Sequence, residues 1–289
     1  AGKLVRCWLP YPRTDQARQR DVKFISASEP DYVLSPQECR HSTLYMEKRA
    51  VQGEPTVFSE TFEYTSCGEW HNLRAEDVLP YDTTTALYKE YTAEREKHIV
   101  FSPRLRELAA KLAAGETNPY LKAKRIFRWI NDHFPWASAR EYSTIENIPE
   151  YVLDNRHGDC GQVSLLFITL CRISGIPAHF QSGFMMHPRA WNLHDWAEVY
   201  FEGVGWVPVD QSFGIPAFAR NADEEYFFLG GIDSWRMIVN TDYGMPLVPE
   251  KKYPRSETVD FQRGEVEWEG GNLYFPQWSY HMDIDYLNY

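Results

Sequence analysis

The 289-residue sequence has few cysteines and no long apolar run. No stretch approaches the roughly 18 apolar residues of a transmembrane helix, so no membrane span is expected. Its cysteines show neither a C-x-x-C pair nor Cys/His spacing typical of zinc, so no metal and no cofactor are expected. They are also too few for a disulfide framework in a chain of this length, although they leave the redox compartment open. The five cysteines are Cys7, Cys39, Cys67, Cys160 and Cys171.

Positive charge is also scarce. Lys and Arg number 30 against 41 Asp and Glu, which gives a net charge of −11. Nucleic acids and anionic membranes bind basic faces, so neither is an expected partner. A hydrophobic content of 43%, with 15% aromatic residues, excludes disorder and indicates a substantial core. The length suits one large domain or two small ones.

A buried helix is predicted to begin at Cys160. Apolar residues fall on nearly every side of the segment 163–171. Asp159 has the character of an N-cap, and Gln162 follows three residues later as its capping-box partner. Gly175 marks the C-terminal end of the helix. Cys160 then takes the first helical position, where free N–H groups and the positive dipole end favour a thiolate. We therefore expect a lowered pKa for this thiol.

A β-hairpin is predicted downstream of this helix. The segments 194–200 and 206–210 have strand character, and a Gly-containing turn at 202–205 separates them. An antiparallel pair centred on this turn sets His194 and Asp210 opposite or diagonal to each other, within side-chain reach. A carboxylate at that position holds an imidazole in one tautomer and stabilises its cation.

Cys160, His194 and Asp210 are the residue types that together can form an activated thiol nucleophile with its base and its orienting carboxylate. A thiol becomes an efficient nucleophile when a neighbouring base takes its proton and a third group orients that base. The alternatives are structural: Cys160 as a buried core cysteine and His194 as an isolated histidine on a strand. The polar, capped helix start and the aspartate across the hairpin favour the catalytic interpretation over both.

The segment 156–214 resembles the transglutaminase-like superfamily, in particular the core of its bacterial and archaeal members. The motifs are Gly158-Asp159-Cys160, the stretch 194–200 and the stretch 203–210, in the family order and spacing. The resemblance covers residues 102–229 more loosely. It implies an α+β, papain-like core with the cysteine helix packed on an antiparallel sheet. It also implies that Cys160 is the nucleophile, His194 the general base and acid, and Asp210 the orienting carboxylate.

Further site residues are expected around this set. The backbone N–H of Cys160 supplies one oxyanion donor. In the superfamily a second donor is often an aromatic or polar side chain ahead of the cysteine, which makes the indole N–H of Trp136 the candidate; packing beneath the helix is the alternative. The residues expected to contact substrate are Gln162, His157, Trp191, Asn192 and Asp195.

Three parts are predicted along the chain. They are an N-terminal β-rich module at 1–100, the catalytic core at 101–230, and a C-terminal segment at 231–289 that packs back on the core and on the N-terminal module. The predicted strands include 4–9, 22–25, 43–46, 57–64, 178–184 and 265–268, and the predicted helices begin at Pro103 and Pro119.

Three function classes stay open from the sequence. The favoured one is a cysteine-dependent peptidase or amidase that forms a thioester acyl-enzyme on a peptide, isopeptide or carboxamide bond. The second is a cross-linking protein-glutamine gamma-glutamyltransferase, and the third is a non-catalytic binding module. The sequence has no acidic triplet with calcium-loop spacing, which argues only against calcium-activated cross-linkers. The intact Cys160, His194 and Asp210 argue against the third class.

The expected partner is a peptide or protein substrate, and the oligomeric state is left open. The start at Ala1, without an initiator methionine, is consistent with a removed leader. A periplasmic or secreted location is therefore expected, and a cytoplasmic one stays open.

Overall fold

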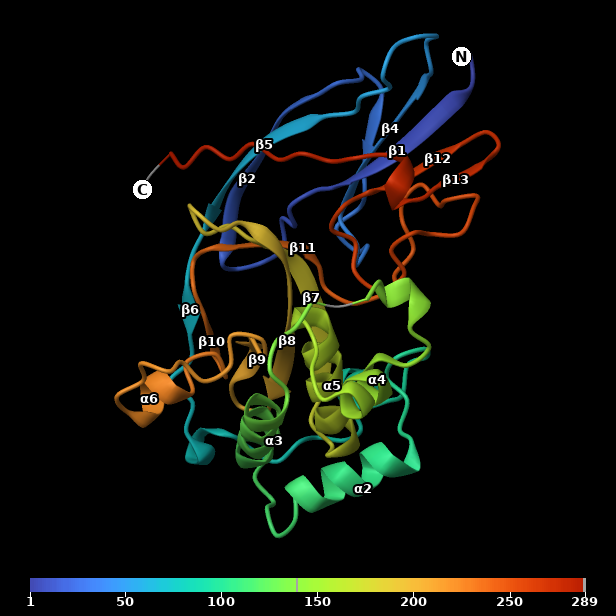
Figure 1. Ribbon diagram of the computed structural model, residues 1–289. Helices are drawn as coiled ribbons and strands as arrows, with labels where there is room; N and C mark the ends of the chain where they lie inside the picture. Colours follow the sequence, from blue (N-terminus) through green and yellow to red (C-terminus); the bar gives the residue numbers. More distant parts are fainter. Residues whose placement is uncertain (139, 288–289) are drawn as a thin grey trace. The chain divides into compact units, whose positions relative to one another are not determined.

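The computed structural model describes residues 1–138 and 140–287, and it divides into two compact units (Figure 1). Unit 1 comprises residues 1–67, 182–193 and those from 235 onward. Unit 2 comprises residues 68–181 and 194–234. Unit 2 contains Cys160, His194 and Asp210, so all three candidate catalytic residues belong to the same compact unit.

Unit 1 is built from antiparallel strands. Its largest sheet has the order β13 (Gly271–Leu273), β12 (Glu265–Trp268), β1 (Leu4–Pro10), β4 (Thr43–Arg49) and β3 (Tyr32–Leu34). On β4, Leu44 and Met46 are fully buried two residues apart, as the period of two of a strand predicts, and Trp8 of β1 is fully buried as well. The strands of unit 1 are β1 (Leu4–Pro10), β2 (Gln19–Ala27), β3 (Tyr32–Leu34), β4 (Thr43–Arg49), β5 (Glu60–Ser66), β11 (Arg236–Asn240), β12 (Glu265–Trp268) and β13 (Gly271–Leu273), with a 3₁₀ turn, η3 (Phe275–Gln277).

Residues far apart in the sequence complete this unit. Strand β12 pairs with β1, so the end of the chain joins the sheet formed by its beginning. Strands β2 and β5 form a separate two-stranded ribbon. Strand β11 pairs with residues 182–185 of β7 (Ala178–Met185). The N-terminal β-rich part is therefore completed by C-terminal strands.

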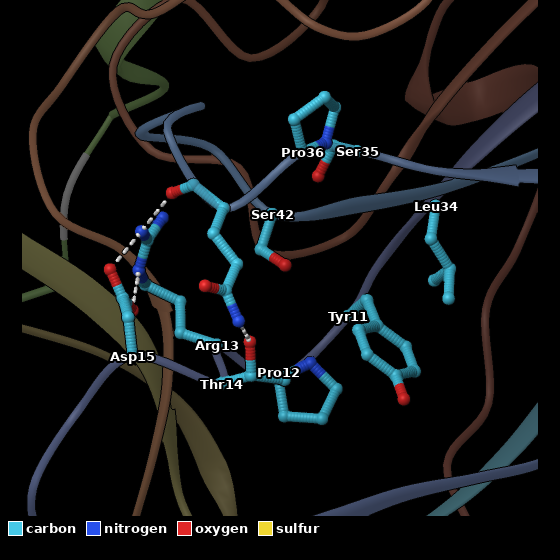
Figure 2. Close-up of a pocket in the computed structure, with 10 residues that line it drawn as sticks. Tyr11, Pro12, Arg13, Thr14, Asp15, Leu34, Ser35, Pro36 and Ser42 are labelled. Carbon is cyan, nitrogen blue, oxygen red and sulfur yellow. Dashed lines mark hydrogen bonds and ion pairs between the residues drawn. The ribbon is translucent and has the colours of Figure 1, made fainter.

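Unit 1 also encloses a small pocket of about 120 Å³ (Figure 2). Inside it, the guanidinium of Arg13 donates to both carboxylate oxygens of Asp15, at 2.8 and 2.7 Å. The same group donates to the carbonyl oxygens of Cys39 and Gln37. These four hydrogen bonds fix the Arg13 guanidinium against the loop that contains Gln37 and Cys39.

Unit 2 surrounds one central helix. Residues 161–172 of α5 are all buried, as expected for a helix that is apolar on nearly every side. Helices α2 to α5 each begin after a side-chain N-cap, from Ser102, Asn118, Asn147 and Asp159 in turn. The helical elements are η1 (Ala75–Asp77), α1 (Ala86–Tyr91), α2 (Pro103–Leu112), α3 (Pro119–His133), η2 (Tyr142–Thr144), α4 (Ile148–Asn155), α5 (Cys160–Ile173) and α6 (Ala222–Glu225).

The hairpin of unit 2 consists of β8 (Asn192–Phe201) and β9 (Gly205–Val209). Its register pairs Phe201 with Gly205 and Ala197 with Val209. Continued to the ends of the strands, this register sets His194 and Asp210 diagonal to each other. The turn contains Gly203, whose φ of +88° lies in the left-handed region. A second antiparallel pair joins β6 (Glu69–Trp70) to β10 (Gly231–Ile232).

The predicted fold class is confirmed, since the structure combines helices with antiparallel sheets. The expected strand at 57–64 begins later, at Glu60, and ends at Ser66. None of the described helices is long and apolar enough to cross a bilayer. The division into 1–100, 101–230 and 231–289 describes parts of the sequence rather than compact units, and it stays a prediction.

Candidate active site

Cys160 occupies the first position of α5, as the sequence predicted. The Asp159 Oδ1 atom accepts the backbone N–H of Gln162 at 3.1 Å. In return the Gln162 Oε1 atom accepts the backbone N–H of Asp159 at 3.3 Å. The predicted capping box is therefore present, and Gly175 ends the helix with a φ of +76°. This local chemistry fixes the start of the helix, and with it the position of the thiol.

His194 and Asp210 form a buried pair across the hairpin. The Nε2 atom of His194 lies 2.7 Å from Oδ2 of Asp210, and both residues are at most 5% exposed. The other carboxylate oxygen of Asp210 accepts the backbone N–H of Phe213 at 3.1 Å. With Nε2 bound to the carboxylate, the ring presents Nδ1 as its second nitrogen. This arrangement can orient an imidazole base and stabilise its cation.

Tyr142 and Asp195 lie at the same helix start. The Tyr142 hydroxyl donates to Oδ1 of Asp159 at 2.5 Å and accepts the backbone N–H of Gly161 at 3.2 Å. The thiol of Cys160 contacts Oδ2 of Asp195 at 3.4 Å. Tyr142 was not predicted from the sequence, because it comes from a separate 3₁₀ turn 18 residues before the cysteine.

The pKa of Cys160 is shifted upward, contrary to the expected lowering. Burial is the largest cause, and the negative charges of Asp195 and Asp159 act in the same direction. A backbone hydrogen bond from Asp195 acts the other way and favours the thiolate. The helix dipole and the neighbouring Asp159 could be predicted from the sequence, but burial of the thiol and its contact with Asp195 depend on tertiary structure. Burial also raises the pKa of Asp159, against the opposing hydrogen bond from Tyr142.

Comparison with known proteins identifies the core. Residues 106–211 match the model of the transglutaminase-like superfamily. The chain contains a transglutaminase-like core. The match includes Cys160, His194 and Asp210, so the resemblance drawn from the sequence motifs is confirmed.

Individual relatives of this core are distant. The chain is 26% identical over 140 residues to an uncharacterized protein, YebA, of Bacillus subtilis, an alignment that covers 42% of this chain. It is 23% identical over 125 residues to a protein-glutamine gamma-glutamyltransferase of Pseudomonas aeruginosa, over 39% of this chain. Both alignments span only 19% of the relative's own length.

A solved structure supports the fold. The crystal structure of a protein described as a candidate cysteine protease, from Cytophaga hutchinsonii, aligns with a TM-score of 0.56 at 19% identity. The alignment covers 82% of this chain and 76% of that one. At this identity the likeness concerns the fold.

Trp136 lies beside the segment that precedes Cys160. It forms an isolated parallel bridge with Gly158, and the next residue, Ala137, donates its N–H to the Gly158 carbonyl at 3.1 Å. The Trp136 side chain is 60% exposed, so it does not pack beneath the helix. Its role as the second oxyanion donor stays a prediction.

The residues expected to contact substrate fall into three groups by burial. Gln162 and Asp195 are 0% and 2% exposed, and their side chains serve contacts inside unit 2. His157 is half-buried, and its Nδ1 atom has no hydrogen-bond partner among the described residues. Trp191 and Asn192 are exposed residues of unit 1. Substrate contact by these five residues stays a prediction.

The site offers no obvious metal centre. Within residues 1–138 and 140–287, no group of three or more His, Cys, Asp or Glu side chains is arranged to hold an ion.

Proposed function

We propose that this protein is a cysteine-dependent hydrolase that cleaves a peptide, isopeptide or carboxamide bond through a thioester. The observation that carries the proposal is the buried His194–Asp210 pair, 2.7 Å apart, in the same unit as a cysteine at a capped helix start. An imidazole held in one tautomer by a carboxylate is the base that a thiol nucleophile needs.

The proposed reaction has two halves. The S–H proton of Cys160 passes to Nδ1 of His194, and Sγ forms a bond with the carbonyl carbon of the substrate. The resulting oxyanion accepts the backbone N–H of Cys160 and the indole N–H of Trp136. As the C–N bond breaks, the imidazolium gives its proton to the leaving amine. A thioester and a free amine, or ammonia, result.

Water then completes the cycle. His194 takes a proton from the incoming water, whose oxygen attacks the thioester carbon. The C–S bond breaks, and the proton returns to the sulfur. The products are a carboxylic acid and the restored thiol, while Asp210 stabilises the imidazolium in both halves without itself becoming protonated.

The carboxylates near the thiol favour water over an amine as acyl acceptor. Asp159 and Asp195 both lie at the start of α5. A nearby negative charge stabilises the protonated form of an incoming lysine, and an ammonium group has no lone pair for attack. A water molecule is neutral and binds without first losing a proton, so the two carboxylates disfavour water as acyl acceptor less than they disfavour a lysine amine.

Cross-linking is the second candidate function. The specific observation in its favour is the similarity to the Pseudomonas aeruginosa protein named as a protein-glutamine gamma-glutamyltransferase, at 23% identity. Such an enzyme would use the same thioester and differ only in the acceptor.

One assay separates the two functions. Glutamine-containing peptides and a casein-like protein are incubated with and without a fluorescent primary amine, and ammonia, peptide cleavage and label are quantified. We expect hydrolysis products to exceed incorporated label, and both to be absent with Cys160→Ala. Cysteine-dependent labelling that outpaces hydrolysis would establish the cross-linker instead.

The expected periplasmic or secreted location belongs to the same proposal. Fractionation of cells that produce the full natural protein, with detection by antibody, tests it. Recovery in the cytoplasmic fraction would contradict this part of the proposal and leave the chemistry untouched.

A further inference from the structure

Asp195 places a second carboxylate at the nucleophile, opposite in effect to the one that orients His194. Its Oδ2 atom lies 3.4 Å from Sγ of Cys160, within hydrogen-bond reach for sulfur. Asp195 is only 2% exposed, and it follows His194 directly on β8. A carboxylate accepts a hydrogen bond from S–H, whereas it repels a thiolate.

The surroundings hold this carboxylate in place. The Tyr142 hydroxyl lies 3.4 Å from the same Oδ2 atom and donates to Asp159 at 2.5 Å. Gly161 leaves room for both groups, since a Cβ atom there would come within 2.7 Å of Asp195 Oδ2 and 2.4 Å of the Tyr142 oxygen. The contact between Asp195 and the thiol is therefore part of a packed arrangement and not a surface encounter.

We propose that Asp195 is a positioning residue that keeps the Cys160 thiol protonated and pointed at its carboxylate until a substrate engages the site. The proton then moves from sulfur to His194, and Asp195 loses the S–H hydrogen bond as the C–S bond forms. The inference rests on the proposed role of Cys160 as nucleophile. It assigns to Asp195 a role distinct from substrate contact.

Among the described residues, the titratable groups at or next to this thiol come from three elements. Asp195 and His194 come from β8, Asp159 is the N-cap of α5, and Tyr142 comes from η2. The carboxylates of Asp195 and Asp159 oppose ionisation of the thiol, whereas the backbone amide of Asp195 supports it. Replacement of the Asp195 side chain by its amide removes one opposing charge and leaves the backbone contact unchanged.

The test is the pH dependence of alkylation at Cys160. The rate of iodoacetamide labelling of the Cys160 peptide is followed by mass spectrometry in the intact protein, with Cys39 and Cys67 as internal references. We expect Asp195→Asn to lower the midpoint of this profile by at least about one pH unit, a tenfold change in the thiol–thiolate equilibrium. Asp154→Asn, at an exposed carboxylate of the same unit, is the matched control and should leave the midpoint unchanged.

Two further measurements keep the inference testable even if the Asp195→Asn variant does not fold. Tyr142→Phe removes a hydroxyl that competes for the carboxylates while Asp195 remains, so the midpoint should stay or rise. In the wild-type protein, the infrared difference spectrum against Cys160→Ala should show a hydrogen-bonded S–H stretch at neutral pH.

Several results would overturn the inference. These are an unchanged or higher midpoint in folded Asp195→Asn, a lower midpoint in Tyr142→Phe, or no S–H band at neutral pH. Alkylation requires no turnover, so an inactive wild-type protein would refute the proposed function and leave these measurements decisive for Asp195.

Discussion

Two regions of unit 2 each contain a buried histidine paired with a carboxylate. His194 lies 2.7 Å from Asp210, and His179 lies 3.1 Å from Glu198. Both imidazoles use Nε2, and both side chains are less than 10% exposed. Distance and burial alone therefore do not separate a pair proposed to be catalytic from a structural one.

The surroundings of the two pairs differ. His179 packs between Tyr91 and Trp206, with ring centroids 5.4 and 4.5 Å away. Gln181 donates to the same oxygen of Glu198 that contacts His179. The His179 pair is thus embedded among aromatic and amide groups.

His194 has a different neighbourhood. Its ring packs edge-on against Phe213, which is 37% exposed, so an apolar surface accessible to substrate adjoins the imidazole. The next residue, Asp195, contacts the thiol of Cys160. An exposed aromatic neighbour and a nearby thiol, rather than the pair itself, distinguish this region, and substitutions in each region can test that difference.

The largest effect is expected from removal of the nucleophile. Cys160→Ala should reduce kcat by at least about 10⁴, because it removes the thiol that forms the acyl-enzyme in the proposed mechanism. The helix should persist, since its cap comes from Asp159 and Gln162. Turnover and the circular dichroism spectrum provide the measurement, with Cys39→Ala as the control at another free, half-buried cysteine. Retained turnover in Cys160→Ala would remove the thiol from the mechanism.

Asp210→Asn should have the next largest effect. The amide keeps the shape but loses the charge that stabilises the imidazolium, and it can favour the wrong tautomer. We expect kcat to fall about 10⁴-fold, as in other triads in which the orienting aspartate is replaced. Turnover is compared with thermal unfolding of the same variant. A decrease of less than tenfold in a folded protein would contradict the orienting role.

A smaller loss is expected for Trp136→Phe. If the indole N–H stabilises the oxyanion, its removal should lower kcat by about 10²–10³ with little change in KM. Because the side chain is exposed, stability should be nearly unaffected. Trp70→Phe, at another exposed tryptophan of unit 2, is the matched control. Equal kcat and KM values for the two variants would show that Trp136 has no role in catalysis.

Local signals made much of this site predictable. The run of apolar residues, the Asp159 cap and Gly175 defined α5, and the glycine-containing turn defined the hairpin that brings His194 to Asp210. These features depend on residues close in the sequence, so a single sequence carries them.

Long-range features were not predictable in the same way. The contact of Asp195 with Cys160 joins residues 35 positions apart, and Tyr142 reaches Asp159 from a short 3₁₀ turn. Burial of the thiol, together with the charges of Asp195 and Asp159, reverses the shift in the Cys160 pKa that the helix dipole alone suggested. The pairing of β12 with β1 likewise depends on tertiary packing and not on any local pattern.

A third buried histidine of unit 2, His98, should make the stability of the protein depend on pH. Burial lowers the pKa of His98 to about 4, and its Nδ1 accepts the backbone N–H of Ile148. His98 therefore binds a proton more readily in the unfolded chain than in the folded protein. The contribution of neutral His98 to folding stability is present above about pH 6.5 and is lost as the pH falls to about 4.

We expect this contribution to decrease by about 2 kcal/mol between pH 7 and pH 5. Urea unfolding of the wild-type protein and His98→Gln at both pH values measures it. The difference in unfolding free energy between the two proteins should shrink at the lower pH. A constant difference would show that His98 does not change its protonation on unfolding.

The smallest effect should come from Glu198→Gln, and it should fall on stability rather than on activity. The amide oxygen can still accept from His179 and Gln181, but without a charge these hydrogen bonds weaken, at a cost of about 1–2 kcal/mol in unfolding free energy. No step of the proposed mechanism uses His179, so kcat should stay within about threefold. Urea unfolding and turnover are measured together with those of Asp210→Asn. A loss of activity by orders of magnitude in Glu198→Gln would show that the two histidine–carboxylate pairs are coupled. The connection would then run through Trp196, whose ring contacts that of His194 and whose indole N–H donates to Gln181.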